Sequence, residues 1–202
     1  MHIEQYINIG YGLHKFTSEE LKPIWDEIMT LDQNWATPNG LINHKSPLVD
    51  CVSHVERLVG EQIVEFNRVN NWPNQLRVID RPTPLKLTGL WVNWMSRHEF
   101  SPIHKHEAVI SFVIWLTVPY TLESEIAARP YVPEHFNFGG QFALHYTDSL
   151  GQVCTQNLPV YTDWESTLCM FPAGVKHSVF PFYSSNQLRV SVAGNFTFDP
   201  SA

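Results

Sequence analysis

The chain has 202 residues, of which 44% are hydrophobic and 16% charged, and its net charge is -7. This composition is typical of one globular domain with a sizeable core and excludes a disordered chain. The acidic balance and the lack of basic runs exclude a nucleic-acid-binding protein of the usual kind, because phosphate contacts need a basic face.

Membrane and secretory segments are not expected either. The N-terminus MHIEQYINIG lacks the basic and apolar regions of a signal peptide, and the longest apolar run, AVISFVIWLTV, is about half as long as a membrane helix. The three cysteines, Cys51, Cys154 and Cys169, form no CxxC pair, which favours reduced thiols. We therefore expect a cytoplasmic protein without a membrane partner, and the sequence leaves a homodimer open.

The chain is predicted to begin with a strand over residues 3–16. Thr17 and Glu20 then have the spacing of a capping box, and apolar residues follow at helical intervals. This pattern predicts a first helix over residues 18–31.

A second helix is predicted after a loop at residues 32–46. Pro47 suits its first position, with Ser46 as the cap, and an apolar stripe continues to about residue 70. We expect residues 1–75 to be largely helical and to support a sheet.

From residue 76 the pattern changes to short strand-like runs separated by Pro, Gly and Asn. Eight such runs predict a sandwich or barrel. They occupy residues 76–80, 85–95, 108–118, 140–146, 152–160, 166–171, 177–182 and 188–198. We therefore expect a single, mainly β domain over residues 1–202, with a double-stranded β-helix (jelly-roll) core at 76–199 and two N-terminal α-helices packed against it. Residues 121–138 carry no strong pattern and are expected to form a functional loop or lid.

His104 and His106 are the first candidate site residues. They precede the apolar run at 108–118, and strand alternation would put both imidazoles on one face. Two imidazoles at the entry of a buried strand are costly as packing and useful as metal ligands. The alternative is that one caps a loop and the other is a hydrogen-bonded core group.

The second half of the candidate site lies about seventy residues later along the sequence. In FPAGVKH a Pro-x-Gly turn delivers His177 to the start of a strand. Arg189 follows after one strand and a return, among apolar neighbours. A buried guanidinium needs an anionic partner, best a carboxylate, and Ser191 on the same face could add a hydroxyl donor. The alternative is a structural salt bridge.

The strand before the His pair supplies further candidates. Trp91 and Asn93 are expected near the same pocket, as walls or substrate contacts, and Ser111 and Tyr146 are added as candidates for the substrate pocket. Core packing is the alternative for the tryptophan. No catalytic side chain is expected beyond the metal centre.

Three imidazoles with open positions suit iron(II), zinc or manganese. The Arg-Ser pair favours iron, since it would hold an organic dianion beside the metal, whereas a hydrolytic zinc site would want a general base.

These residues resemble the iron(II)/2-oxoglutarate-dependent oxygenases, in particular their small prolyl-4-hydroxylase-like bacterial and phage members. The resemblance covers roughly residues 85–198 and rests on the strand with Asn93, on HKH with the following SFVIWL, on FPAGVKHSVFP and on RVS. It implies that His104 and His177 bind Fe(II), that Arg189 binds the distal carboxylate of 2-oxoglutarate and that Ser191 assists it. It also implies a hydroxylase that consumes 2-oxoglutarate and O2 and acts on a protein side chain or a small molecule.

One position departs from the family pattern. The family has a carboxylate ligand where this chain has His106. Glu107 is adjacent, but alternation points it to the opposite face unless a bulge intervenes. A three-His site would carry one more positive charge, which should favour the dianionic co-substrate.

Two alternatives remain at this point. A cupin-type three-His metal dioxygenase would explain HKH and PAGVKH, although the glutamate expected a few residues after the His pair is missing at positions 109–112. A non-catalytic jelly-roll binding or structural module would bind no metal.

Overall fold

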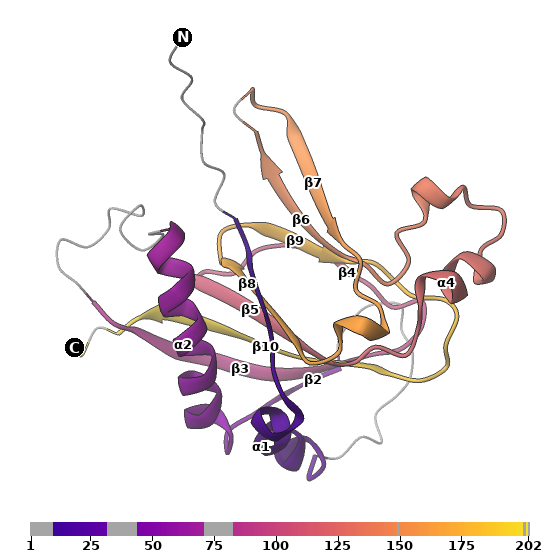
Figure 1. The fold of residues 1–202 in the computed structure, drawn as a ribbon. Coiled ribbons are helices and arrows are strands. Elements are labelled where there is room, and N and C mark those ends of the chain that lie inside the picture. Colours follow the sequence, from indigo (N-terminus) through magenta and orange to yellow (C-terminus); the bar gives the residue numbers. More distant parts are fainter. Residues whose placement is uncertain (1–9, 32–43, 71–82, 149, 200, 202) are drawn as a thin grey trace.

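Two antiparallel β-sheets form the body of the protein (Figure 1). The structure is a computed structural model that describes residues 10–31, 44–70, 83–148, 150–199 and 201. The larger sheet has the order β1 (Gly12–Lys15), β8 (Thr167–Pro172), β5 (Ile110–Thr117), β10 (Arg189–Phe198), β3 (Leu85–Met95) and β2 (His44–Pro47). The smaller sheet has the order β4 (Ser101–His104), β9 (Lys176–Val179), β6 (Phe142–Thr147) and β7 (Val153–Leu158).

The prediction of a mainly β chain is confirmed, and seven of the predicted runs contain an observed strand. The predicted strand at 76–80 lies outside the described residues. Strand β1 lies within the strand predicted over residues 3–16, of which 3–9 are outside the described residues, whereas β2 was not predicted; both join the larger sheet at its edges.

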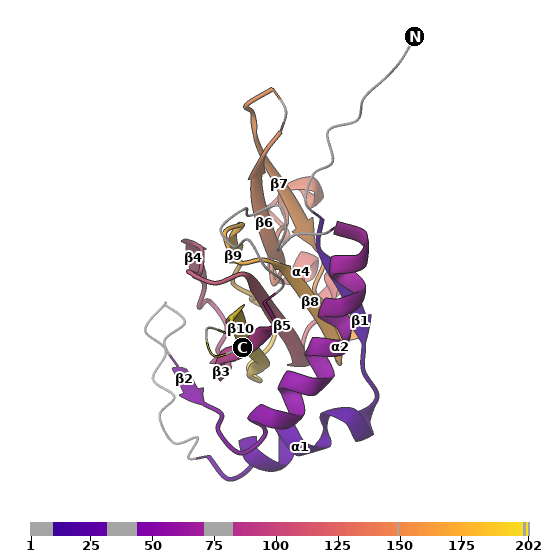
Figure 2. The same ribbon diagram turned by 90° about the vertical axis from the view of Figure 1, so that its left-hand side faces the viewer.

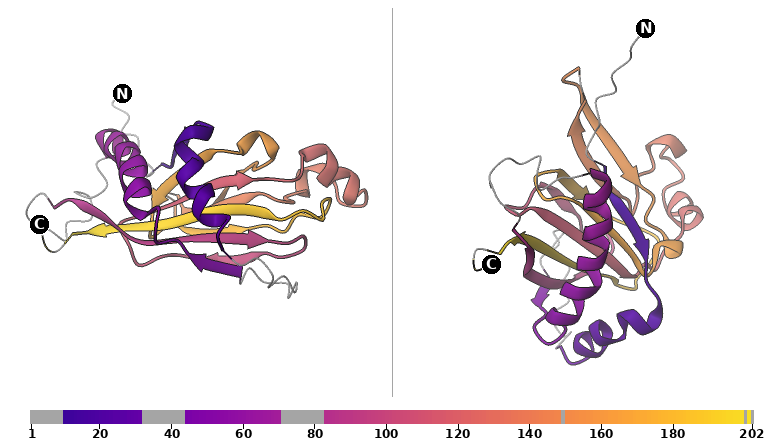
Figure 3. Two further views of the ribbon diagram at one scale, coloured as in Figure 1. Left: turned by 90° about the horizontal axis from the view of Figure 1, so that it is seen from below. Right: turned by 60° about the vertical axis from the view of Figure 1, so that its left-hand side comes forward.

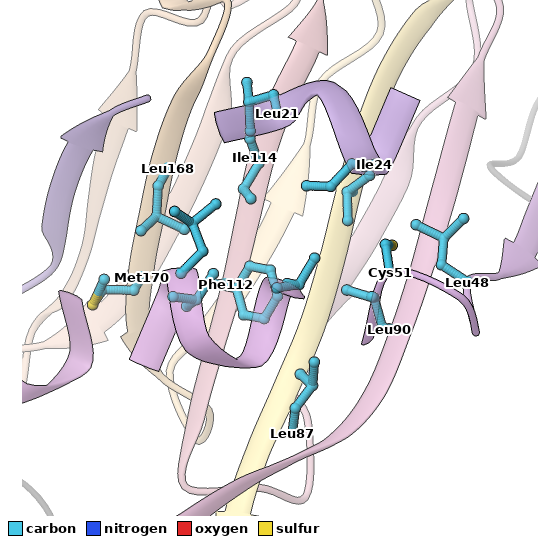
Figure 4. Packing of buried hydrophobic residues seen from close by; sticks show 14 of the residues in the cluster. Leu21, Ile24, Leu48, Cys51, Leu87, Leu90, Phe112, Ile114, Leu168 and Met170 are labelled. Atoms are coloured by element: carbon cyan, nitrogen blue, oxygen red, sulfur yellow. The ribbon is translucent and has the colours of Figure 1, made fainter. Parts of the chain in front are cut away.

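The long apolar run of β5 is explained by burial on both faces of the larger sheet. Val113 and Trp115 point into the space between the sheets, where they meet Phe142 and other buried residues. Phe112 and Ile114 point to the other face, which is covered by helices α1 (Ser18–Ile28) and α2 (Val52–Asn70) (Figures 2 and 4). A strand enclosed in this way loses the apolar–polar alternation of a half-exposed strand.

Helix α1 begins where the capping box predicts it. The Thr17 side chain accepts from the backbone N–H of Glu20, and the Glu20 carboxylate accepts from the backbone N–H of Thr17 at 2.8 Å. Leu21 and Ile24 are fully buried against the sheet, and each such side chain contributes about 1.5–3 kcal/mol.

The predicted start of the second helix at Pro47 is wrong. Residues His44–Pro47 form β2, which pairs with β3, and helix α2 begins only at Val52. Proline is tolerated here because β2 is an edge strand. The turn into α2 is stabilised from α1, where the buried Glu27 carboxylate accepts from the backbone N–H groups of residues 49, 50 and 51.

The predicted loop at 121–138 is also wrong in its structure. It contains helix α4 (Leu122–Ala128) and a 3-10 turn at Glu134–Phe136. The fully buried Glu125 of α4 accepts hydrogen bonds from the backbone N–H groups of Tyr183 and Ser184, so that α4 is docked onto the segment that follows β9. A capping box at Thr121 and Ser124 marks its start, with Ser in place of the usual Glu or Gln.

The β6–β7 hairpin projects beyond the larger sheet (Figure 3). No helix in the described parts of the chain combines the length and the apolar character that a membrane crossing needs.

Candidate metal centre and co-substrate pocket

The structure brings the three predicted histidines together. His104 ends β4 and lies directly opposite His177 of β9. His106 lies in the connection between β4 and β5, and its backbone N–H donates to the Ala173 carbonyl at 3.1 Å. One potential ligand atom from each ring lies within 4.8 Å of the others. The two imidazoles lie together as predicted, while Lys105 and Glu107 pair with each other away from the histidine group, although β4 itself ends at His104.

Backbone carbonyls orient two of these rings. The Nδ1 atom of His104 lies 2.8 Å from the Pro102 carbonyl, and that of His177 lies 3.3 Å from the Val175 carbonyl. A carbonyl can only accept, so each Nδ1 carries the proton and each Nε2 keeps a lone pair for a metal.

Burial keeps His106 and His177 in the neutral form that binds metals. Burial, followed by the electrostatic influence of the neighbouring His104, lowers the pKa of His177 to about 3. The pKa of His106 is also lowered, first by burial and then by His104 and Lys45. A metal ion therefore has to displace no proton from either ring near neutral pH.

Glu107 lies outside the histidine group. Its side chain is 86% exposed and forms an ion pair with Lys105 at 2.8 Å. The alternative in which a bulge turns this carboxylate toward His104 is not what the structure shows.

Arg189 is 3% exposed and its guanidinium is only partly satisfied by the protein. Nη1 donates to the Tyr120 hydroxyl at 3.0 Å and to the Gly140 carbonyl at 3.2 Å, and Nη2 contacts the Met95 sulfur at 2.7 Å. Nε is buried without a hydrogen-bond partner. Within the described residues no carboxylate pairs with Arg189, so the structural salt bridge considered as an alternative is not observed there.

One cavity contains the histidines, Arg189 and most of the other predicted site residues. Its walls include Ser191, Asn93, Trp91 and Ser111. The Oδ1 of Asn93 accepts from Trp91 Nε1 at 3.1 Å, which leaves the amide N–H groups of Asn93 for a ligand. Ser111 instead donates to Asn195 at 2.7 Å.

Tyr146 does not line this cavity. It lies on the projecting β6–β7 hairpin and borders a second pocket with Tyr11, Leu144 and Gln156. Phe142 lines the first cavity, whereas β9 pairs with β6 only from Phe142 to His145, so Tyr146 lies beyond the part of β6 that has a neighbouring strand on both sides.

Several residues of the site were missed in the sequence, and Tyr120, Met95 and Lys45 are the most informative of them. Tyr120 orients Arg189, and its ring stacks on Phe182 with 4.7 Å between the ring centroids. Met95 contacts the guanidinium, and Lys45 lines the cavity beside Trp91. Tyr120 and Lys45 lie where the sequence shows no pattern. Alternation along β3 puts Met95 on the same face as Asn93, but only the strand register shows that Met95 lies opposite Arg189.

The residues present fit an iron(II) ion and a dianion. Three neutral imidazoles suit a first-row metal, and the buried Nε of Arg189 still needs an acceptor. The chemistry of this donor set is that of a metal centre with a carboxylate-binding cation in one cavity.

The comparison with family models agrees with this geometry. Residues 89–195 match the model of a family described as "Putative 2OG-Fe(II) oxygenase". The match covers more than half of the chain and includes the three histidines and Arg189. A search of curated proteins found no match.

Solved structures of this kind share the fold at low sequence identity. An oxidoreductase of the 2OG-Fe(II) oxygenase family from Burkholderia pseudomallei is 15% identical, with 93% of this chain and 84% of that chain covered and a TM-score of 0.52. A prolyl-4-hydroxylase from Pseudomonas putida is 14% identical, with 95% of this chain and 94% of that chain covered and a TM-score of 0.56. HygX from Streptomyces hygroscopicus, solved with iron bound, is 11% identical, with 95% of this chain and 83% of that chain covered and a TM-score of 0.54. Together with the family match over residues 89–195, the shared fold leads to one conclusion: the chain belongs to the 2OG-Fe(II) oxygenases, a family of oxidoreductases that depend on iron(II) and 2-oxoglutarate.

Proposed function

We propose that this protein is an Fe(II)- and 2-oxoglutarate-dependent dioxygenase that hydroxylates its substrate, with iron held by His104, His106 and His177. The distal carboxylate of 2-oxoglutarate is bound by Arg189. The observation that carries the proposal is the partly satisfied, buried Arg189 in the same cavity as the three imidazoles. A cupin-type site or a non-catalytic module would not explain why a guanidinium is buried beside the histidines with Nε lacking an acceptor.

The protein residues prepare the site before any ligand enters. The Pro102 and Val175 carbonyls hold the His104 and His177 rings with Nε2 toward the centre. Nη1 of Arg189 donates to the Tyr120 hydroxyl and to the Gly140 carbonyl. Nε is free to donate to a carboxylate, and Nη2 can do so when it exchanges its contact with the Met95 sulfur for a carboxylate oxygen. A guanidinium fixed in this way loses little conformational entropy when it pairs with a carboxylate.

The polar neighbours of Arg189 complete the co-substrate site. Ser191 is two residues further along β10 and faces the same cavity, where its hydroxyl can donate to the bound carboxylate. Asn93 lies opposite Ser191 on β3, and its amide can donate to the co-substrate. Phe142, Phe171 and Trp115 supply apolar walls that exclude water from the reacting atoms.

Iron(II) at the three histidines supplies the activation of O2 that the hydroxylation requires. In the net reaction, 2-oxoglutarate, O2 and a substrate C–H bond give succinate, carbon dioxide and a C–OH group. The third imidazole replaces the carboxylate of the family pattern, so the site carries one more positive charge and attracts the dianionic co-substrate more strongly.

Anaerobic titration of the metal-free protein with Fe(II) and 2-oxoglutarate tests the proposal. We expect a visible metal-to-ligand charge-transfer band in the wild type, together with succinate formation when O2 is admitted. The band should be lost in His177→Ala and should require far more 2-oxoglutarate in Arg189→Met. Glu107→Gln, which changes the exposed carboxylate next to His106, is the matched control and should behave like the wild type. A wild-type protein that binds iron but gives no band with 2-oxoglutarate would contradict the proposal.

A further inference from the structure

The cavity has a second cation that the proposed function does not use. Lys45 lies on β2 directly opposite Asn93 of β3, so its side chain extends the inner face of the larger sheet. It lines the same cavity as the histidines, and its Nζ lies 5.6 Å from the centre of the Trp91 ring. This distance is within the range of a cation–π contact.

The two cations differ in burial and so mark different ends of the cavity. Arg189 is 3% exposed and occupies the inner end, whereas Lys45 is exposed and marks the open end. The Trp91 ring contacts both the Lys45 ammonium and the His106 ring, with 5.8 Å between the centroids of the two rings. A ligand that binds beside His106 is therefore within reach of Trp91 and Lys45.

The charge of the cavity is unbalanced. Lys45 and Arg189 both line it, and none of the described residues that line it is acidic. Exposed lysines are usually only solvated, but this one lies over an aromatic wall beside a half-buried imidazole and makes no ion pair among the described residues. The whole chain carries a net charge of -7, so the positive cavity is a local feature and not a consequence of composition.

We infer that Lys45 binds an anionic group, a carboxylate or a phosphate, of the substrate that is hydroxylated, with Trp91 packing against the adjoining part of that substrate. The inference rests on the proposed function, in which Arg189 is already occupied by 2-oxoglutarate. An anion at the open end then neutralises the remaining charge, and Lys45 contributes a charge-assisted hydrogen bond.

Binding of small probes to the full chain, loaded with diamagnetic Zn(II) and 2-oxoglutarate, tests the inference. Phenylacetate and phenyl phosphate carry the anion on an aromatic body, and phenylacetamide is the neutral match to phenylacetate. Dissociation constants come from calorimetry, and the indole N–H resonance of Trp91 reports the place of binding. We expect the anions to bind about tenfold or more tightly than the amide. The tighter of the two anions identifies the group.

Variants assign this preference to Lys45. Lys45→Met keeps the length of the side chain and should remove the preference for anions, whereas Lys45→Arg should keep it. Lys105→Met is the control, because Lys105 is paired with Glu107 outside the histidine group. Equal binding of phenylacetate and phenylacetamide to the wild type, or an unchanged preference in Lys45→Met, overturns the inference.

The two proposals fail separately. A wild type that turns over 2-oxoglutarate but shows no preference for anions refutes only the substrate class. A wild type that binds no 2-oxoglutarate refutes the proposed function, whatever the probes do.

Discussion

Arg189 shows how a buried cation can be held ready for a ligand. The hydroxyl of Tyr120 accepts from Arg189 Nη1 and donates to the Gly140 carbonyl. Tyr120 thereby holds the guanidinium in place between the segment that follows β5 and the segment that precedes β6. We predict that Tyr120→Phe weakens 2-oxoglutarate binding about 3–10-fold, which corresponds to one hydrogen bond, and leaves metal affinity unchanged. Titration of the metal-loaded protein with 2-oxoglutarate measures the effect.

Tyr161→Phe is the matched control for this change. Its hydroxyl accepts from Gln141 and not from Arg189, and its ring lies 6.3 Å from that of Tyr120. An equal loss of 2-oxoglutarate affinity in both variants would show that Tyr120 acts through packing and not through the guanidinium.

His106 is the residue at which this chain departs from the family pattern. We predict that His106→Ala weakens metal binding by more than about 100-fold, since loss of an outer partner of a ligand already costs about 10–100-fold. His106→Asp should bind metal far better than His106→Ala, because a carboxylate is also a ligand for iron(II). It should bind 2-oxoglutarate more weakly than the wild type, since the centre carries one positive charge less.

Competition with a colorimetric chelator measures the metal affinities of these variants. Wild-type metal affinity in His106→Ala would show that His106 is not a ligand.

Sequence patterns located the residues whose chemistry is costly to bury. His104, His177, Arg189, Ser191 and Asn93 all line the observed cavity. Tyr146 was misplaced because alternation says on which face of a strand a side chain lies, not where the strand leaves the sandwich. Lys45 was missed because its place depends on which strand β2 pairs with, and a four-residue edge strand has too little pattern to reveal a partner.

At the scale of elements, α1 stabilises the start of α2 through one carboxylate. Glu27 is 6% exposed and accepts from the backbone N–H groups of Val49, Asp50 and Cys51. We predict that Glu27→Gln lowers the free energy of unfolding by about 1–3 kcal/mol at neutral pH, because buried donors lose a charged acceptor. Chemical denaturation measures this change, with the exposed Glu19→Gln of the same helix as control.

The effect of Glu27 should depend on pH in a defined direction. Burial alone would raise the pKa of this carboxyl, but the hydrogen bonds from residues 51, 49 and 50 outweigh it and hold the pKa below its ordinary value of 4.5. A lowered pKa in the folded state means that the stabilisation is present above pH 4.5 and is lost as the pH falls through the folded-state value. The difference between wild type and Glu27→Gln should therefore shrink in acid, and a constant difference would contradict this assignment.

Local signals predicted elements well only where they did not depend on partners. The capping box of Thr17 and Glu20 located the start of α1, since both hydrogen bonds are local. Pro47 misled because proline suits a helix start and an edge strand equally, and the cap of α2 comes from Glu27, about two dozen residues earlier. Helix α4 was missed because its docking depends on the buried Glu125 and the distant Tyr183 and Ser184.

At the scale of the whole molecule, the proposed site joins the two sheets. His104 and His177 belong to the smaller sheet, and Arg189 belongs to the larger sheet. A metal alone contacts only the smaller sheet and its connection to β5. A co-substrate that chelates the metal and pairs with Arg189 would connect both sheets across the core.

This arrangement predicts that metal and 2-oxoglutarate stabilise the fold together more than separately. At about 100 times its dissociation constant a ligand adds about 2.7 kcal/mol. For a chain of this length that corresponds to a rise in melting temperature of roughly 5–10 °C. Thermal unfolding with Ni(II), with 2-oxoglutarate and with both measures the effect, and EDTA should reverse it. Arg189→Met should keep the rise caused by metal and lose the additional rise caused by 2-oxoglutarate. If 2-oxoglutarate stabilised the wild type equally with and without metal, the two ligands would not share the cavity as proposed.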